Sequence, residues 1–221
     1  MRNPVPHTIH GNTFWVSPER CLYWEEKNTL IVSDLHFGKS GHFRKEGIAI
    51  PQNVYKADLQ RLIAQLYLFK ADKLYIVGDM THSKVNRELG LFLRWRKDFP
   101  TLEIELIRGN HDILAESWYK EAGITVHEQR LSSPPFLFLH DPQLRKKLSG
   151  EEQGLYSFTG HVHPGVSIKG KGKQFLTFPC FYFARDYCVL PAFSRFTGTF
   201  MVSPEFDETT FAIVENALVR M

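Results

Sequence analysis

Polar residues able to bind a metal ion recur along this chain directly after short apolar runs. The first run, Leu30–Val32, leads into Asp34 and His36 and breaks at Gly38. Successive side chains of a strand point to opposite faces, so an Asp and a His two positions apart point the same way and can bind one cation. A single Asp-x-His pair is weak evidence, because solvated loops after strands also contain it.

Four further apolar runs end in a similar way. They are followed by Gly78–Asp79, by the Gly-Asn-His-Asp sequence of 109–112, by His140 and by the Gly-His-Val-His sequence of 160–163. Ligands of open α/β sheets gather at the carboxyl ends of strands, so these side chains are expected to converge. Each motif alone also fits a turn or a hydrogen-bonded histidine. Seven potential ligands on five strand ends favour a metal site over these alternatives.

The elements that would position these residues follow two patterns. In the first half, an N-terminal hairpin (13–16 and 21–24) precedes buried strands at 30–32, 73–78 and 102–107, which alternate with helices at 52–70, 86–98 and 113–121. From residue 124 onward short strands follow one another, at 124–131, 136–139, 156–159, 165–168, 174–178, 187–190 and 210–219. The charged stretch 143–153 is expected to be a surface excursion. Together these patterns predict a layered α/β sandwich, with two sheets face to face and helices outside.

Length and composition set further bounds. A chain of 221 residues with 43% hydrophobic composition can bury the core of a single domain, expected to span 1–221. Residues 1–16 contain no apolar signal-peptide region, and no apolar run approaches about 18 residues, so we expect a cytoplasmic protein with no membrane span. Three cysteines without C-x-x-C spacing (Cys21, Cys180 and Cys188) are expected to be reduced core residues. The net charge of +3 permits an anionic partner without requiring one.

The order Asp-x-His, Gly-Asp, Gly-Asn-His-Asp, His, Gly-His-x-His resembles that of the calcineurin-like metallophosphoesterases, and the match spans most of the chain. More narrowly, residues 33–39 and 42–44, with the late segments 190–193 and 196–198, are similar to the bacterial ligase-associated DNA damage response endonucleases of that superfamily. The resemblance implies a layered αββα sandwich of two mixed β-sheets flanked by helices. It also implies a dinuclear metal site at the C-terminal ends of the strands.

The resemblance also implies a division of roles. Asp34, His36 and His163 would hold one metal, Asn110, His140 and His161 the other, and Asp79 would bridge them. Mixed carboxylate, amide and imidazole ligands suit Mn²⁺ first, with Fe²⁺ or Zn²⁺ as alternatives, better than Ca²⁺ or Mg²⁺. Two such ions about 4 Å apart can share a hydroxide and aim it in line at phosphorus. His111 would hydrogen-bond the phosphoryl group and protonate the departing alkoxide.

Four more residues are candidates for substrate binding. Lys39, His42 and Arg44 would form part of a basic loop beside the first metal that holds nucleic-acid phosphates, and a solvated loop is an equal alternative. His82, three residues after Asp79, is either a contact near the metals or a solvated loop histidine. The basic stretches at 145–147 and 169–173 are interpreted as ordinary surface charge.

The function implied is that of a metal-dependent phosphodiesterase, specifically a DNA endonuclease of DNA repair, functionally linked to an ATP-dependent DNA ligase and a helicase. A small-molecule phosphoesterase acting on cyclic nucleotides or nucleotide-sugar lipids stays open, as does a scaffold that keeps the fold without catalysis. A Ser/Thr protein phosphatase is disfavoured, because Met80–Ser83 follows Asp79 where such enzymes would show Asp-Arg-Gly. The sequence leaves the strand preference and the oligomeric state open.

Overall fold

The computed structural model describes residues 3–39, 53–82, 87–170, 172 and 174–221. Its first sheet has seven strands in the order β1-β2-β3-β4-β5-β6-β7. These are β1 (Val5–Ile9), β2 (Asn12–Ser17), β3 (Cys21–Trp24), β4 (Thr29–Val32), β5 (Lys73–Val77), β6 (Glu103–Ile107) and β7 (Ile124–His127). Strands β1 to β4 pair antiparallel and β4 to β7 pair parallel, so the sheet is mixed.

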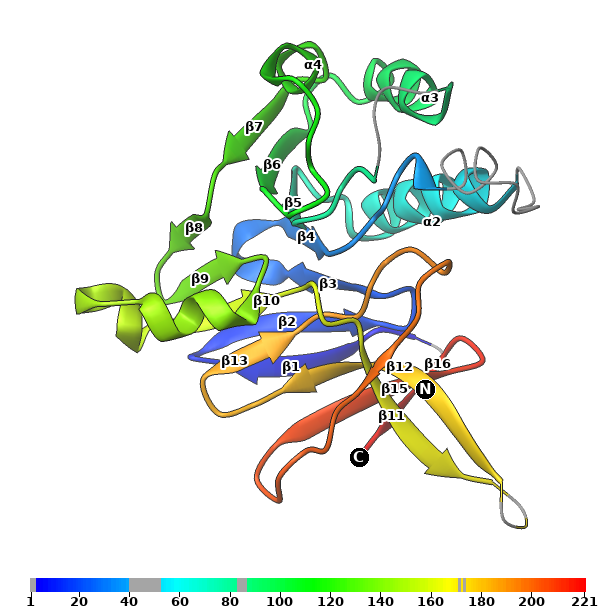
Figure 1. Ribbon diagram of the computed structural model, residues 1–221, viewed down its shortest axis with the longest axis vertical. Coiled ribbons are helices and arrows are strands. Elements are labelled where there is room, and N and C mark those ends of the chain that lie inside the picture. Colours follow the sequence, from blue (N-terminus) through cyan, green and yellow to red (C-terminus); the bar gives the residue numbers. More distant parts are fainter. Residues whose placement is uncertain (1–2, 40–52, 83–86, 171, 173) are drawn as a thin grey trace.

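Three α-helices lie along the parallel half of this sheet (Figure 1). They are α2 (Asn53–Phe69), α3 (Arg87–Arg96) and α4 (Glu116–Glu121), and each lies between two consecutive parallel strands, as parallel pairing requires. A short 3-10 helix, η1 (Glu25–Lys27), joins β3 to β4. Buried helix residues such as Leu62, Phe92 and Trp118 share one apolar cluster with strand residues such as Ile76 and Leu106.

The second sheet has nine strands, and its main path runs in the order β14-β11-β12-β13-β10-β9-β8. The strands are β8 (Arg130–Ser133), β9 (Phe136–Leu139), β10 (Tyr156–Thr159), β11 (Pro164–Lys169), β12 (Phe175–Phe183), β13 (Tyr187–Val189), β14 (Phe200–Met201), β15 (Thr209–Val214) and β16 (Ala217–Arg220). Strand β15 pairs with β12 and β16. Two 3-10 helices, η2 (Pro142–Lys147) and η3 (Gly150–Gly154), occupy the charged stretch between β9 and β10 and bury none of their residues.

The two sheets pack on each other through a core rich in aromatic rings. Phe14 and Trp24 of the first sheet meet Phe136 and Phe158 of the second, with ring centroids 4.9 to 5.1 Å apart for the cross-sheet pairs among them. Rings at these separations and tilted angles gain about 0.5–1.5 kcal/mol per pair beyond their buried area. This shared core confirms the expected sandwich of two mixed sheets with flanking helices, and it fixes the strand ends of both sheets relative to each other.

Several element boundaries differ from those predicted. The run 124–131 is two strands, because the polar pair Glu128–Gln129 separates β7 in the first sheet from β8 in the second. The run 210–219 is the hairpin β15–β16, which turns at Glu215 and Asn216, both with positive φ. Strands β1 and β14 were not predicted, α4 begins three residues later than expected and β12 is longer.

The three cysteines are buried and free, as expected. Among the described residues, none of the helices combines the length and apolarity needed to cross a membrane.

Candidate metal centre

Five strand ends, three from the first sheet and two from the second, deliver the predicted ligands to one place. In the first sheet, β4 ends two residues before Asp34, β5 two before Asp79 and β6 three before Asn110. In the second sheet, β9 ends directly before His140, and β10 ends two residues before His161. The predicted convergence at the carboxyl ends of strands is therefore present in the structure, and it draws on both halves of the chain.

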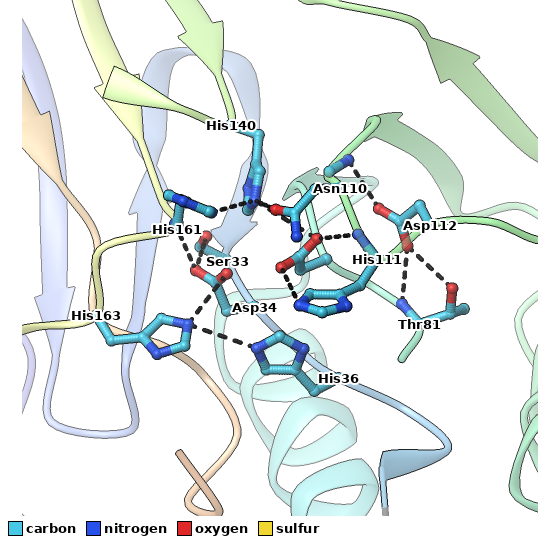
Figure 2. Close-up of polar contacts among 12 residues, drawn as sticks. Ser33, Asp34, His36, Thr81, Asn110, His111, Asp112, His140, His161 and His163 are labelled. Atoms are coloured by element: carbon cyan, nitrogen blue, oxygen red, sulfur yellow. Dashed lines mark hydrogen bonds and ion pairs between the residues drawn. The ribbon is translucent and has the colours of Figure 1, made fainter. Parts of the chain in front are cut away.

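One group of side chains joins Asp34, His36 and His163 (Figure 2). The Nε2 atoms of His36 and His163 lie 3.4 Å apart, and His163 Nε2 lies 3.3 Å from Asp34 Oδ1. The Asp34 side chain has no exposed surface, and its Oδ1 accepts no hydrogen bond. A buried carboxylate oxygen in this position, with two imidazole nitrogens facing it, fits a bound divalent cation.

A second group lies beside the first and joins Asp79, His140 and His161. The Nε2 atom of His140 is 3.2 Å from His161 Nδ1, 3.5 Å from Asp79 Oδ1 and 3.3 Å from Asn110 Oδ1. The other nitrogen of His140, Nδ1, donates to the carbonyl oxygen of Val77 at 3.0 Å. That hydrogen bond places the ring proton on Nδ1, so the Nε2 lone pair points at the other three groups and can bind a metal.

The backbone at these positions is unusual. Asp34, His36, Asp79, His161 and His163 all have φ between 49° and 68°, in the left-handed region that non-glycine residues rarely adopt. Asp34 and His36 therefore do not continue the pleat of β4, and the predicted reason for their common direction is wrong. They meet because two left-handed residues turn the chain, with Asp34 N bonded to Gly78 O and His36 N to Asp79 O. Strain held at such a place is typical of a functional site.

The acidic and basic groups of the site shift each other's pKa values. Burial raises the pKa of Asp79, but the hydrogen bond and charge of His140, together with the hydrogen bond from His111 N and the nearby His36, outweigh burial and lower it to about 2. Burial also opposes the charged form of His140, yet Asp79 and Asp34 raise the pKa of its imidazole to about 9, so a metal that binds at Nε2 would displace a proton from it. For His36 burial prevails and lowers the pKa to about 3, so this imidazole is neutral at pH 7 and its lone pair is available to a metal.

His111 and His82 lie next to the two groups without joining them. The backbone N–H of His111 donates to Asp79 Oδ1 at 2.9 Å, and its side chain is 42% exposed with Nε2 3.9 Å from Asp79 Oδ2. The rings of His111 and His82 are 4.3 Å apart, and both lie within 6 Å of the His36 ring. His82 therefore lies beside the candidate ligands, and its role as a contact of the metals or the substrate stays a prediction.

Only Lys39 of the predicted basic loop lies within the described residues. Lys39 is half-buried, and this burial lowers the pKa of its ammonium group below the ordinary value, although the charges of Asp34 and Asp79 oppose the shift. Lys39 therefore lies within the electrostatic field of the site. His42 and Arg44 lie outside the described residues, so their predicted contact with substrate stays a prediction.

Residues 27–180 match the family model described as calcineurin-like phosphoesterase. The chain therefore belongs to the calcineurin-like phosphoesterase family. This confirms the resemblance expected from the sequence, and it makes the chain a hydrolase of phosphoester bonds. The two groups of side chains described above are the candidate metal sites of this phosphoesterase.

Among solved structures, the chain is similar to the Pseudomonas putida nuclease MPE, with a TM-score of 0.83 and 28% sequence identity over 99% of this chain and 100% of that one. A protein of unknown function from Aquifex aeolicus, AQ665, matches with a TM-score of 0.45 and 20% identity over 61% of this chain and 78% of that one. The comparison with curated proteins returned no match.

The structure adds two residues of this phosphoesterase to which the sequence assigned no role. The hydroxyl of Ser33 contacts Asp34 Oδ2 and donates to Val77 O at 2.8 Å. Asp112 is buried and accepts from Thr81 N at 2.8 Å and Gly109 N at 2.9 Å, which ties together the loops that carry Asp79 and Asn110. Both residues lie inside the sequence motifs, so their place near the site could be predicted. Their hydrogen-bond partners Val77 and Thr81 could not, because those come from segments that only the fold brings together.

Two motif glycines leave space that the site needs. A Cβ at Gly109 would overlap both the carboxylate and the backbone nitrogen of Asp79, and a Cβ at Gly160 would overlap the hydroxyl of Ser33 and come within 2.8 Å of Asp34 Oδ2. Gly109, after β6, therefore lets Asp79, after β5, come close to its backbone. Gly160, after β10, does the same for Asp34, after β4.

Gly109→Ala is expected to displace the backbone and the carboxylate of Asp79, so that the strand end shifts and the protein loses at least half of its bound divalent metal. Gly154→Ala is the matched control, because a Cβ there meets nothing within 4 Å. Elemental analysis after loading with Mn²⁺, together with circular dichroism, measures both effects. Full metal content in Gly109→Ala would show that this close approach is not needed for metal binding.

The contrast between Asp79 and Asp34 gives a second prediction. If Asp79 bridges two ions, Asp79→Asn should lower the occupancy of both sites, whereas Asp34→Ala should mainly empty one. The measurement is the number of metal ions per chain, with activity on a phosphodiester in parallel. Two ions and full activity in Asp79→Asn would contradict the bridging role.

Proposed function

We propose that this phosphoesterase is a two-metal nuclease that hydrolyses phosphodiester bonds in DNA and acts in DNA repair in the cytoplasm, in functional linkage with an ATP-dependent DNA ligase and a helicase. The observation that carries the proposal is the pair of adjacent ligand groups with an exposed histidine, His111, beside them. Likeness to a solved nuclease over the whole length of both chains supports a nucleic-acid substrate. The complete set of ligands argues against a scaffold that has lost catalysis.

The ligand set also supports the proposed metal. Asp34, His36 and His163 would hold one ion and Asn110, His140 and His161 the other, with Asp79 between them. Imidazole, carboxylate and amide donors together suit Mn²⁺, with Fe²⁺ or Zn²⁺ as alternatives. When bound, two such ions would lower the pKa of a water molecule between them and neutralise phosphoryl oxygens.

The protein's own residues then orient the reaction. The buried network around Asp34 and Asp112 fixes the strand ends, so the ligands are in place before substrate arrives. The hydrogen bond from His111 N to Asp79 Oδ1 fixes the backbone that carries the His111 ring. On the open side of the site, that ring would hydrogen-bond the phosphoryl group and give a proton to the departing oxygen.

A nuclease assay tests the proposal. With Mn²⁺, the purified protein is expected to cut single-stranded, duplex or gapped DNA. It should act more slowly on a cyclic nucleotide when both substrates are supplied at the same concentration of phosphodiester bonds. Omission of metal and addition of a chelator should abolish the activity. Hydrolysis of the cyclic nucleotide without cleavage of any DNA would replace the nuclease by a small-molecule phosphoesterase.

The role of His111 is tested by changing the leaving group. A DNA strand leaves as an alkoxide that needs a proton, whereas a nitrophenolate leaves without one. We expect His111→Ala to keep both metals, to lose about 10²-fold to 10⁴-fold of its rate on DNA, and to lose clearly less on bis(p-nitrophenyl) phosphate.

His127→Ala, a histidine variant outside the site, is the control and should match the parent protein on both substrates. Equal losses on the two substrates for His111→Ala would indicate stabilisation of the phosphoryl oxygens instead of proton transfer. Loss of metal would show that His111 is a ligand.

A further inference from the structure

A cavity of about 270 Å³ opens beside the first group of predicted ligands. His163 forms part of its wall, together with Arg20, three threonines, two prolines and the segment around Gly198; the full lining is Arg20, His163, Pro164, Thr177, Pro179, Ala192, Thr197, Gly198 and Thr199. This volume lies just below the range of roughly 300–1,000 Å³ of pockets for small molecules, so it admits one ring system with a sugar but no base pair. The wall combines polar and apolar surface and contains no carboxylate.

Two residues of the cavity wall, Thr177 and Pro179, belong to a projecting hairpin, β11–β12, visible at the lower right of Figure 1. Across this hairpin Gly165 pairs with Pro179, Ser167 with Thr177 and Lys169 with Phe175. Because side chains alternate along a strand and paired residues share a face, the cavity residues Thr177 and Pro179 lie on the same face as Lys169 and Phe175.

The opposite face of the hairpin has a different role. Val166 and Cys180 belong to a small apolar cluster with Ala212, and Ile168 packs against it, so that face is attached to the body of the protein. The cavity face is left open, with Ser167, Lys169 and Thr177 exposed and the Phe175 side chain 68% exposed. Residues 164–183 contain three lysines and no acidic residue, which suits an anionic partner.

We propose that this cavity binds the nucleoside next to the phosphodiester that is cleaved, and that the attached strand continues along the hairpin to Phe175 and Lys169. The inference rests on the proposed function for the chemistry at the metals. The threonine hydroxyls supply hydrogen bonds to the sugar and base, Phe175 offers a ring on which a base stacks, and Lys169 pairs with a phosphate. A base that enters a cavity of this size must be unpaired.

Two small phosphodiesters that share the same leaving group, p-nitrophenolate, test the cavity. Thymidine 5′-(p-nitrophenyl phosphate) carries a nucleoside where methyl p-nitrophenyl phosphate carries a methyl group, so the ratio of their kcat/KM values reports the nucleoside alone. We expect the parent protein to prefer the thymidine ester at least tenfold. Thr177→Trp, which fills the cavity, should lower that ratio about tenfold, mainly through KM.

Matched variants keep this test interpretable. Thr125→Trp places the same side chain on an exposed threonine of β7 and should keep the ratio. Thr177→Val replaces only the hydroxyl with a methyl group, retains the fold and should lower the ratio about threefold, the effect of one hydrogen bond. A parent protein without preference for the thymidine ester, or an unchanged ratio in both Thr177 variants, would overturn the proposal.

The hairpin face is tested by binding. Phe175→Ala should weaken the affinity for a single-stranded oligonucleotide at least about fivefold, the lower end of the effect of one stacked base. Phe206→Ala, which removes another exposed phenylalanine, should leave it unchanged. Equal affinities of Phe175→Ala and the parent protein would overturn the path along the hairpin. A parent protein that prefers the thymidine ester but cuts no DNA would instead refute the nuclease and leave the nucleoside cavity standing.

Discussion

The buried carboxylate of Asp34 is the point on which the arrangement of the two sheets at the site depends. A carboxylate without exposed surface is costly unless its oxygens are paired or bind a cation. One oxygen, Oδ2, contacts Ser33 and accepts from His161 N at 3.1 Å, while Oδ1 faces His163. His161 and His163 come from the second sheet and Asp34 from the first, so the candidate metal site is complete only where the two sheets are docked.

The close contacts between the strand ends also explain why the chain tolerates strained backbone conformations at the site. Five predicted ligands adopt left-handed φ values, each at a cost of about 1 kcal/mol or more. Such conformations persist where neighbouring contacts determine them, and here the backbone of each strand end is bonded to another end: Asp34 N to Gly78 O, Gly160 N to His140 O and Phe193 N to Ser33 O. Each of these loops is hydrogen-bonded to the loop that follows a different strand. Moving one ligand therefore requires moving several strand ends together, and this makes the site rigid before metal binds.

Much of this was visible in the sequence, for a physical reason. Buried parallel strands are apolar runs, and a polar residue directly after such a run lies at the sheet edge, so the convergence of Asp34, Asp79 and His140 followed from pattern alone. The left-handed turns did not, because no local preference of Asp or His demands them and only contacts between strand ends impose them. Likewise the split of 124–131 depends on which sheet each half joins. The turn at Glu215 and Asn216 carried a detectable signal in the sequence, namely the Asn. A tight hairpin turn requires positive φ, and Asn adopts positive φ more readily than most residues.

The segment that follows β13 links the metal site to the cavity beside it. On one side, Phe193 N donates to Ser33 O and Ser194 N to Asp34 O at 3.2 Å, so the segment supports the backbone of a predicted ligand. On the other side, Arg20 donates to Ala192 O and to Ser194 O at 2.9 Å, and the Arg61 guanidinium lies 4.1 Å from the centre of the Phe193 ring. Ala192 and Arg20 also line the cavity. A shift of this segment would therefore move the backbone of Asp34 and the cavity wall together, so under the proposal above it would keep the nucleoside and the attacked phosphorus in a fixed relation to each other.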